Sequence, residues 1–385
     1  MDNNIIDKKI SKWEDFDISH DLLRGIYAYG FENPSEIQKN GIPLILSKKD
    51  VIAQAQSGSG KTATFSIGVL NSIDVNVKSL QAIIIAPTHE LAIQISTVVS
   101  KLGGFMEGLV VKTIIGGTSI NEDALDIKNT NPQIVVGCAG RLNDMIKRKY
   151  LIVSKVHLLV LDEADELLSS GFKIQISNIY QVLPENVQVA LFSATLPDEI
   201  KELTKKFMHN PVSIVIKNEE LSLECIQQRY IALQDDHMKY EMLKQIFEII
   251  SVSQCIIYCN SVKRVIDLYN AMIDENFSVC AIHSSMDKLA REETFKQFRC
   301  GGFRVLISSN ITARGIDVQQ VSTVINFDVP NCVHTYLHRI GRSGRWGRKG
   351  LAINFITKYD VRMMQEIEKH YKISISEFSE SPLKK

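Results

Sequence analysis

The segment AQSGSGKT, Ala55–Thr62, has the composition of a loop that binds a phosphate chain. It follows a short apolar run and precedes a helical stretch, and its glycines let successive backbone amides point toward one anion. The Lys61 ammonium can reach the β- and γ-phosphates of a nucleotide, and the Thr62 hydroxyl can ligate Mg²⁺. The alternative is an ordinary Gly/Ser turn before a helix, and Ala55 stands where the general pattern has glycine. The order of strand, loop, Lys-Thr and helix favours phosphate binding by Ala55, Gln56, Ser57, Gly58, Ser59, Gly60, Lys61 and Thr62.

A second group of chemically active residues follows about one hundred residues later, in VHLLVLDEADE at 156–166. Its acidic residues come directly after an apolar strand, and ligands of open α/β sheets bind at the carboxyl ends of the strands. Asp162 can hold Mg²⁺, and Glu163 can orient and deprotonate the water that attacks a γ-phosphate. Alone, this segment is equally consistent with a solvated acidic turn that caps a helix. Together with the phosphate loop, it predicts hydrolysis of a nucleoside triphosphate.

A third segment, GRSGRWGRKG at 341–350, places four basic residues in a glycine-rich loop. Such runs are commonly solvated faces or patches that bind polyanions. The spacing of Arg342 and Arg345 also suits two guanidinium groups that converge on a triphosphate, which would stabilise the charge that develops during phosphoryl transfer. Both interpretations remain open from the composition of this segment.

The rest of the chain alternates short apolar runs with longer amphipathic stretches, which predicts parallel sheets with helices on both faces. We expect strands in the first half at Val51–Gln54, Ala82–Ala86, Val111–Ile115, Ile134–Gly137, Val156–Leu161 and Val189–Phe192. In the second half we expect Cys255–Tyr258, Val279–Ile282, Phe303–Ser308, Thr323–Phe327 and Ala352–Ile356. The pattern predicts an N-terminal α/β domain at 1–215, which carries the phosphate loop, a polar linker at 216–226 and a second α/β domain at 227–385.

Composition restricts the class of protein and its partners. Apolar residues make up 45% and charged residues 23% of the 385 residues, which is typical of a soluble globular protein. No apolar run approaches the ~18 residues that cross a bilayer, and the N-terminus lacks the pattern of a secretion signal. Seven cysteines at irregular spacing indicate a reducing compartment. The net charge is zero, but residues 1–220 carry 22 basic and 26 acidic side chains and residues 221–385 carry 22 and 18. A nucleic acid would therefore be bound by local basic clusters.

Several short motifs, taken in order, make the chain similar to the DEAD-box RNA helicases. They are Gln38, AQSGSGKT, PTHELA, the glycine pair at 116–117, AGR at 139–141, DEAD at 162–165, SAT at 193–195, ARGID at 313–317 and HRIGRSGR at 338–345. The resemblance runs from about Trp13 to about Tyr371. The segments LLRGIYAYGFENPSEIQ and VIAQAQSGSGKTATF are most similar to the initiation factor 4A group within that family. The resemblance implies two tandem RecA-like lobes, each a mainly parallel sheet flanked by helices.

The resemblance also assigns roles in ATP binding, hydrolysis and coupling. Gln38 would read adenine, since its amide offers both a donor and an acceptor, while Phe31 and Trp13 would stack near the base and Asp317 would contact the ribose. Arg342 and Arg345 become the catalytic fingers beside Lys61, Asp162 and Glu163. The residues assigned to coupling hydrolysis with movement are Ser193, Ala194, Thr195, Asp165, His338 and Arg339. The hydroxyls of SAT could equally cap the following helix.

The implied RNA contacts are mostly small residues with accessible amides, joined by a few arginines. Such groups contact phosphate and sugar, so the resemblance implies sequence-independent, salt-sensitive binding of single-stranded or short duplex RNA. They are Pro87, Thr88, His89, Gly116, Gly117, Gly140, Arg141, Asn260, Arg291, Ser309, Arg314 and Gly315. Departures from the family pattern lie mainly on this side, at His89, Cys138, Ala139, Lys288, Ser309 and Asn310, while the positions implied in ATP chemistry are intact apart from Trp13.

We therefore expect an enzyme that uses ATP and Mg²⁺ to unwind short RNA duplexes or remodel RNA–protein complexes without processive movement. The alternative is an ATP-gated RNA clamp with weak turnover that scaffolds partners, and a DNA-directed motor is a more distant one. By family analogy we expect an activating scaffold protein, a monomeric enzyme that contacts no membrane, and a cytoplasmic location, with the nucleus also possible.

Overall fold

The computed structural model describes residues 10–56, 58–169, 171–216, 225–249, 253–312, 320–343 and 349–378. The chain divides into two compact units, Met1–Lys217 and Asn218–Lys385. The division falls inside the 216–226 segment, and each unit is described by itself. Within the described residues, no helix has the length and apolar content needed to span a bilayer.

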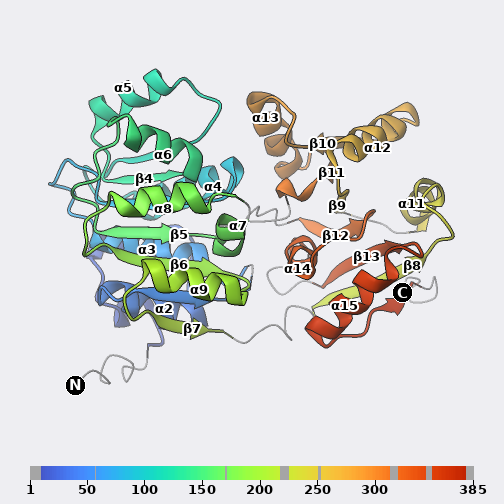
Figure 1. Ribbon diagram of the computed structural model, residues 1–385, viewed down its shortest axis with the longest axis horizontal. Coiled ribbons are helices and arrows are strands. Elements are labelled where there is room, and N and C mark those ends of the chain that lie inside the picture. Colours follow the sequence, from blue (N-terminus) through green and yellow to red (C-terminus); the bar gives the residue numbers. More distant parts are fainter. Residues whose placement is uncertain are drawn as a thin grey trace. The chain divides into compact units, whose positions relative to one another are not determined.

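The first unit is built on a sheet of seven strands, ordered β3-β4-β2-β5-β6-β1-β7 (Figure 1). All of its paired strands are parallel. The strands are β1 (Val51–Gln54), β2 (Ala82–Ile85), β3 (Val111–Ile114), β4 (Ile134–Gly137), β5 (Leu158–Leu161), β6 (Gln188–Ser193) and β7 (Val212–Val215). Since parallel strands need a crossover between them, helices cover both faces of the sheet.

Alternate residues of each strand face opposite sides of this sheet, so each face has its own apolar core. On one face, Ala82 and Ile84 pack with α1 (His20–Ala28), α2 (Glu36–Leu46), α3 (Lys61–Ser72) and α4 (His89–Leu102). On the other face, Ile83 and Ile85 pack with α5 (Ile120–Thr130), α6 (Ala139–Lys147), α7 (Ala164–Ser169), α8 (Lys173–Gln181) and α9 (Asp198–Phe207). A short 3-10 helix, η1 (Trp13–Asp15), precedes α1.

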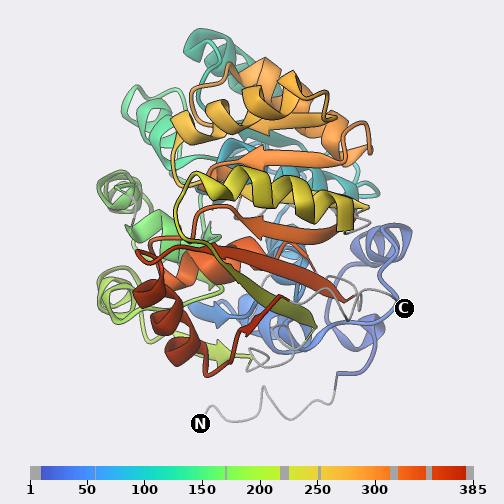
Figure 2. The same cartoon turned by 90° about the vertical axis from the view of Figure 1, so that its right-hand side faces the viewer.

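The second unit repeats this plan with a seven-stranded sheet ordered β10-β11-β9-β12-β13-β8-β14. Its strands, again parallel in every pair, are β8 (Ile226–Ala232), β9 (Gln254–Tyr258), β10 (Val279–Ile282), β11 (Val305–Ser308), β12 (Val321–Asn326), β13 (Gly350–Ile356) and β14 (Ser376–Glu377). On one face, α11 (Met238–Ile249) and α12 (Val262–Asp274) pack against Cys255 and Ile257 of β9 (Figure 2).

The opposite face of the second sheet is covered by three other helices. Phe298 of α13 (Lys288–Arg299) packs with Ile256 of β9, while Tyr336 of α14 (Val333–Ile340) and Ile367 of α15 (Val361–Tyr371) pack with β13. A one-turn 3-10 helix, η2 (Asn310–Thr312), follows β11.

The predicted fold class, two tandem α/β lobes with mainly parallel sheets, is confirmed. The buried strands lie within a few residues of their predicted positions. Sequence analysis did not predict β7, β8 and β14, which lie at or near the edge of their sheets. Strands β7 and β8 are only partly buried, and both residues of β14 are exposed, so these strands lack the continuous apolar runs that identified the central strands.

Candidate nucleotide and nucleic-acid sites

The sheet order of the first unit places its chemically active loops in two neighbouring groups. The phosphate loop follows β1, the acidic segment follows β5, and the SAT segment begins at the last residue of β6. These three strands are adjacent in the order β5-β6-β1, and their carboxyl ends meet at one edge of the sheet. The segments implied in RNA binding follow β2, β3 and β4, which are adjacent in the order β3-β4-β2. One edge of one sheet therefore carries both groups side by side.

The phosphate loop leads directly into α3 through glycine. Gly60 is the N-cap of α3, has a φ of +103°, and provides no capping side chain. The first amides of α3 are therefore left for an anion rather than for a serine or aspartate cap. Gln56 Oε1 and Ser59 Oγ are buried and have no hydrogen-bond partner in this structure. A loop with open amides and unused side-chain polar atoms is suited to hold phosphate oxygens.

Lys61 is the first residue of α3, and its side chain is only 6% exposed. Its ammonium donates to the backbone carbonyl of Ala55, 2.5 Å away, so it lies across the phosphate loop. A buried ammonium requires hydrogen-bond acceptors. Phosphate oxygens offer this group stronger acceptors than a neutral carbonyl, because hydrogen bonds between ionised partners are roughly twice as strong as neutral ones.

The predicted adenine-reading residue, Gln38, lies against this loop. Gln38 is buried in the first turn of α2, and its Oε1 accepts a hydrogen bond from the Ser35 amide at 2.6 Å. A Cβ built on Gly60 would lie 2.8 Å from Gln38 Nε2, so only glycine fits at this position. Ser35 Oγ donates to the Ser59 carbonyl at 2.8 Å, which ties the two segments together. Sequence analysis missed Ser35, although a serine three residues before Gln38 is a capping-box pattern.

The two aromatic residues predicted near the base lie in different environments. Phe31 is half-buried, with its ring centroid 4.9 Å from that of Tyr29 and 6.2 Å from that of Trp13. Trp13 is wholly buried and also packs against Phe16. In this structure Trp13 packs beside Phe31, and its own contact with a nucleotide stays a prediction.

The acidic segment begins at the carboxyl end of β5. Asp162 is buried, and its Oδ1 accepts a hydrogen bond from the Glu163 amide at 3.0 Å. Burial, followed by the neighbouring Glu163 charge, raises the pKa of Asp162 above its ordinary value, and Lys61 opposes this rise. Glu163 has a φ of +48°, a left-handed conformation that costs a non-glycine residue about 1–2 kcal/mol. The strained turn at Glu163 therefore keeps the Asp162 and Glu163 carboxylates close enough for their charges to interact.

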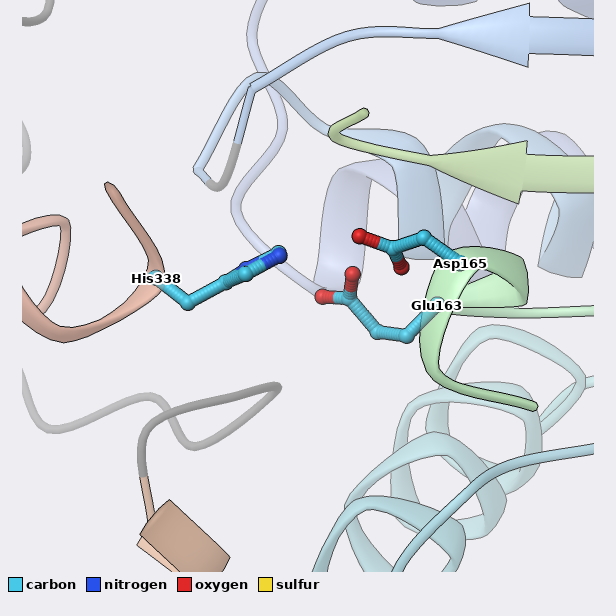
Figure 3. A group of neighbouring side chains, drawn as sticks. All are labelled: Glu163, Asp165 and His338. Atoms are coloured by element: carbon cyan, nitrogen blue, oxygen red, sulfur yellow. The ribbon is translucent and has the colours of Figure 1, made fainter. Parts of the chain in front are cut away.

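Asp165 connects this segment to SAT by hydrogen bonds. Thr195 Oγ1 donates to Asp165 Oδ2 at 2.6 Å, and the Asp165 amide donates to Ser193 Oγ at 3.4 Å. Figure 3 shows the Glu163 and Asp165 carboxylates next to each other at the start of α7. The Ala55 amide donates to the Ser193 carbonyl at 3.1 Å, so SAT contacts the phosphate loop as well. The phosphate loop and the acidic segment are therefore both hydrogen-bonded to SAT.

The residues predicted to hold Mg²⁺ suit a hard cation. Asp162 offers a carboxylate in which burial favours the protonated form, and a cation would reverse that preference. The Thr62 hydroxyl lies in the first turn of α3, directly after the phosphate loop. Carboxylate and hydroxyl oxygens are the ligands that Mg²⁺ takes. The donor set therefore fits the ion.

The RNA-side segments of the first unit are joined by close contacts. Thr88 caps α4 by accepting from the Leu91 amide, and His89 is the first residue of that helix. A Cβ on Gly116 would lie 3.3 Å from His89 Nε2, so the glycine lets the two loops approach. Pro87 is buried, whereas Gly117 and Gly140 are exposed. The exposed backbone of these glycines can contact a phosphate or sugar without side-chain obstruction.

Arg141 holds the loop after β3 against α6. Its guanidinium forms an ion pair with Asp123 at 2.9 Å and donates to the Thr118 carbonyl at 2.7 Å. Sequence analysis assigned Arg141 to RNA and missed Asp123, which lies in the amphipathic segment of α5 and carries no motif. Part of the Arg141 guanidinium is thus used to hold the loop after β3 in place. The side chain also contributes a positive charge to this surface.

The second unit contains a buried arginine with an unusual set of partners. Arg339 of α14 donates from Nε and Nη2 to Asn310 Oδ1 at 2.8 and 2.6 Å. It also donates to Asn326 Oδ1, to the Asp328 carbonyl and to Asn260 Oδ1. Burial lowers the pKa of Arg339 to about 10. Its hydrogen-bond acceptors in the described structure are thus neutral amide and carbonyl oxygens.

The hydrogen bonds of Arg339 include one to Asn260, which sequence analysis assigned to RNA binding. Asn260 accepts from Arg339 at 2.7 Å and donates from Nδ2 to the Val329 carbonyl at 2.8 Å. Asn326 and Asp328 were missed by sequence analysis, although they follow the apolar part of β12, where polar side chains indicate a strand end. Arg291 is only 8% exposed. Its assignment to RNA, which requires an accessible side chain, stays a prediction.

The remaining predicted residues of the second unit are only partly described. His338 and Arg342 lie at the end of α14, and Arg342 Nε donates to the His338 carbonyl at 3.1 Å. Ser309 lies between β11 and η2 and is half-buried. The predictions for Ser57, Arg314, Gly315, Asp317 and Arg345 lie outside the described residues.

Comparison with known proteins identifies the family. Residues 35–203 match the DEAD/DEAH box helicase model, and residues 238–347 match the helicase conserved C-terminal domain. The chain is 50% identical over 371 residues to the ATP-dependent RNA helicase eIF4A of Pyricularia oryzae, covering 96% of this chain and 93% of the relative. The eIF4A of Neurospora crassa is 49% identical over the same share of both chains. The chain belongs to the DEAD-box helicase family.

Solved structures agree with this assignment. Saccharomyces cerevisiae Dbp5 bound to RNA and ADP BeF3 matches with a TM-score of 0.90 and 33% identity, covering 96% of each chain. Mss116p bound to single-stranded RNA and AMP-PNP matches with a TM-score of 0.85 and 28% identity, covering 94% of this chain and 78% of that one. The predicted family and enzyme class are therefore confirmed: this DEAD-box protein is an ATP-hydrolysing, eIF4A-like RNA helicase. The roles of its individual residues stay predictions.

Two departures of this DEAD-box helicase lie at the start of one helix. Cys138 is the N-cap of α6 and makes no side-chain capping bond, and Ala139 is the first helical residue. The family's threonine and proline would fit these positions, because threonine caps amides and proline suits the first turn. Cys138 and Ala139 therefore leave α6 without a side-chain N-cap and without a proline at its first position.

Proposed function

We propose that this DEAD-box helicase couples RNA-dependent ATP hydrolysis to local strand separation or RNA–protein remodelling through the loops that end β1, β5 and β6. The observation that supports this most strongly is their direct hydrogen bonding. Ala55 contacts Ser193, and Thr195 contacts Asp165, so the phosphate loop, the acidic segment and SAT form one connected cluster. Such a cluster can respond as a unit when the γ-phosphate is bound or lost.

In the proposed reaction, Lys61 leaves the Ala55 carbonyl and donates to the phosphate oxygens of ATP. Glu163, held in its strained turn, accepts a proton from the attacking water, and its unpartnered Oε2 is available for that hydrogen bond. Mg²⁺, held by Thr62 and Asp162 when bound, would neutralise charge on the phosphates. Gln38 and Phe31 hold adenine in this proposal, so we expect ATP to be preferred over GTP.

Coupling then proceeds from the acidic segment to SAT. Glu163 and Asp165 are separated by one residue, so a change at the water-binding carboxylate moves the acceptor of the Thr195 hydroxyl. Ala194 lies between the two hydroxyl residues, and its carbonyl accepts from Gln54 of β1 at 3.3 Å. From the second unit, we propose that Arg342 and Arg345 stabilise the developing phosphate charge and that Asp317 contacts the ribose. His338 and Arg339 complete the coupling set.

RNA binds, in this proposal, along the loops after β2, β3 and β4. The exposed Gly117 and Gly140 offer backbone contacts, and His89 and Arg141 offer side-chain donors. These groups contact phosphate and sugar, so binding is independent of base sequence and weakens with salt. Asn260, Arg291, Ser309, Arg314 and Gly315 are the proposed contacts in the second unit.

The test is steady-state ATPase activity with and without single-stranded RNA. Glu163→Gln removes the proposed base while keeping the shape of the side chain, and it should abolish RNA-stimulated turnover. Glu166→Gln, three residues later in α7, is the matched control and should leave turnover unchanged. Single-stranded DNA of the same sequence should stimulate much less than RNA. Equal turnover in Glu163→Gln and the unmodified chain would contradict the proposal.

A clamp with weak turnover is the second candidate, and the departures in RNA-side and coupling positions favour it. His89, Cys138 and Ala139 alter the start of two helices on the RNA side. Asn310 gives Arg339 a neutral acceptor where the family has a carboxylate. Under this alternative, ATP supports tight RNA binding, measured by fluorescence anisotropy, while turnover stays at the Glu163→Gln level.

We further propose an activating scaffold partner and a cytoplasmic site of action. The solved complexes of Dbp5 with Gle1 and with Nup159 are examples of partner binding in that relative. We base the proposed cytoplasmic site and a monomeric active form on the similarity to eIF4A. Titration of the ATPase with a scaffold protein that activates eIF4A would test the first point.

A further inference from the structure

The first unit contains a cavity of about 710 Å³ at the sheet edge opposite the nucleotide and RNA loops. Its lining comes from residues that precede β2, β4 and β5, from α5, and from the segment that follows α6. Because all the strands are parallel, these segments gather at the amino ends of the strands, away from the carboxyl ends described above. The cavity is thus separate from the proposed catalytic and RNA-binding loops.

The cavity is basic. Lys78, Lys128, Lys149 and Lys155 line it, and none of its lining residues is acidic. Lys78 donates to the Gly108 carbonyl at 3.0 Å. The ammonium groups of Lys128, Lys149 and Lys155 form no ion pair with the described residues. Three uncompensated ammonium groups around one hollow attract an anionic partner.

The acidic residues of α5 do not neutralise these lysines. Asp123 is paired with Arg141 at 2.9 Å, and Asp126 is paired with Lys112 at 2.8 Å. Neither aspartate lines the cavity, nor does Glu122, the third acidic residue of α5, whereas Leu125 and Lys128 of the same helix do. The helix therefore presents an apolar and basic face to the cavity and keeps its paired carboxylates elsewhere.

The lining also contains exposed aliphatic side chains. Leu125 is 60% exposed and Ile152 is 63% exposed, and Tyr150 adds an aromatic ring. Aliphatic groups at a basic hollow do not suit RNA, whose recognition relies on stacking faces and phosphate contacts. They suit the apolar side chains of a peptide, with its carboxylates placed over the lysines.

We propose that this cavity, lined by Leu125, Lys128, Lys149, Ile152 and Lys155, docks an acidic peptide segment with apolar side chains from a partner protein. Its charge complementarity and its exposed aliphatic residues select this occupant. The cavity lies away from the nucleotide and RNA loops, so a docked partner leaves the catalytic cycle open. This gives the helicase a site for recruitment that does not depend on the proposed function.

The experiment uses the full chain and two labelled synthetic peptides of about 14 residues. One carries Leu on one face and Asp and Glu on the other, and its partner replaces every acid by Asn or Gln. We expect the acidic peptide to bind at least about tenfold more tightly in fluorescence anisotropy, and to lose affinity as salt rises. Equal binding of the two peptides would overturn the proposal.

Two variants with matched controls localise the binding. Lys128→Glu changes an exposed lysine in the last turn of α5, and Lys101→Glu changes an exposed lysine in the last turn of α4. Ile152→Ser and Ile174→Ser each change an exposed isoleucine, inside and outside the cavity. We expect about tenfold weaker binding for each cavity variant and less than about twofold change for each control. Equal weakening in variant and control would overturn the proposal.

Two further readouts separate this site from RNA binding and from catalysis. A single-stranded RNA added in excess should leave the peptide bound, and RNA affinity should be unchanged in Lys128→Glu. Displacement by RNA, with weaker RNA binding in that variant, would show a nucleic-acid surface and overturn the proposal. RNA-stimulated ATPase activity should be unchanged in all four variants. If the unmodified chain lacked this activity, the proposed catalytic function would fail while the peptide-binding result still stood.

Discussion

Replacing Asn310 by aspartate should stabilise the second unit, because it gives a buried arginine the carboxylate it lacks. Arg339 Nε and Nη2 both donate to the single oxygen of the Asn310 amide. In Asn310→Asp the same fork meets two carboxylate oxygens, which is the geometry that arginine prefers. Residue 310 is exposed, so the new carboxylate keeps much of its hydration.

The magnitude follows from the pKa of the arginine. Burial lowers the pKa of Arg339 to about 10, well below its ordinary value, and one pKa unit corresponds to about 1.4 kcal/mol. Burying the charge therefore costs about 3 kcal/mol at neutral pH. A partly exposed carboxylate recovers only a fraction of this, about 1–2 kcal/mol. In thermal unfolding that gain corresponds to an increase of roughly 2–8 °C.

The assay is thermal unfolding of the full chain, combined with hydrogen exchange of peptides from α14. The local readout is needed because a chain with two units does not have to unfold in one step. Asn310→Ala removes both hydrogen bonds and should destabilise by about 1–3 kcal/mol. Arg339→Gln completes a double-mutant cycle, in which the gain from Asn310→Asp should disappear.

The stabilisation by Asn310→Asp should depend on pH in a definite direction. An aspartate beside Arg339 has a lower pKa in the folded state than in the unfolded state, so its contribution is present above its unfolded pKa of about 3.9. The gain should be lost as the pH falls through the folded pKa. If Asn310→Asp is no more stable than the unmodified chain at pH 7, or if its gain persists in Arg339→Gln, the reasoning about the buried arginine is wrong.

Three further changes test other features of the first unit. The double variant Cys138→Thr, Ala139→Pro should stabilise α6 by about 1 kcal/mol in urea unfolding, because it restores an N-cap and a favourable first residue; no gain would contradict the capping argument. Arg141→Ala should weaken RNA binding and raise hydrogen exchange in α5, whereas Asp123→Asn should raise exchange with little loss of RNA affinity; identical effects would show that Arg141 acts only as a brace. Glu163→Gly should raise the thermal stability of the first unit by relieving its positive φ, with a gain of about 1 kcal/mol, while ATPase activity is lost; a lower stability would show that the turn is not strained.

Sequence was most informative where function depends on consecutive residues. The phosphate loop at 55–62 and the acidic segment after β5 lie at the predicted strand ends, because strand period and glycine position are local properties. The buried central strands were predictable for the same reason. Strand β7 was not predicted, since its partly buried residues form no distinctive pattern.

Contacts between distant segments were harder to predict than the segments themselves. Nothing in the local sequence pairs Arg141 with Asp123, or Asn310 with Arg339, because these pairs depend on how strands cross over in the sheet. Trp13 was assigned to the nucleotide by its place in the chain, and the structure buries it in contact with Phe31 and Phe16. Whether it also contacts the base depends on side-chain packing that a one-dimensional pattern does not contain.

The order β3-β4-β2-β5-β6-β1 has a consequence for how such a protein can diverge. The boundary between the two groups of loops runs between β2 and β5, so each group is carried by its own three strands. Substitutions at His89, Cys138 and Ala139 fall on one side of this boundary and leave the other strands unchanged. The loops proposed to contact RNA can therefore diverge in sequence while the loops proposed to bind and hydrolyse ATP are inherited unchanged.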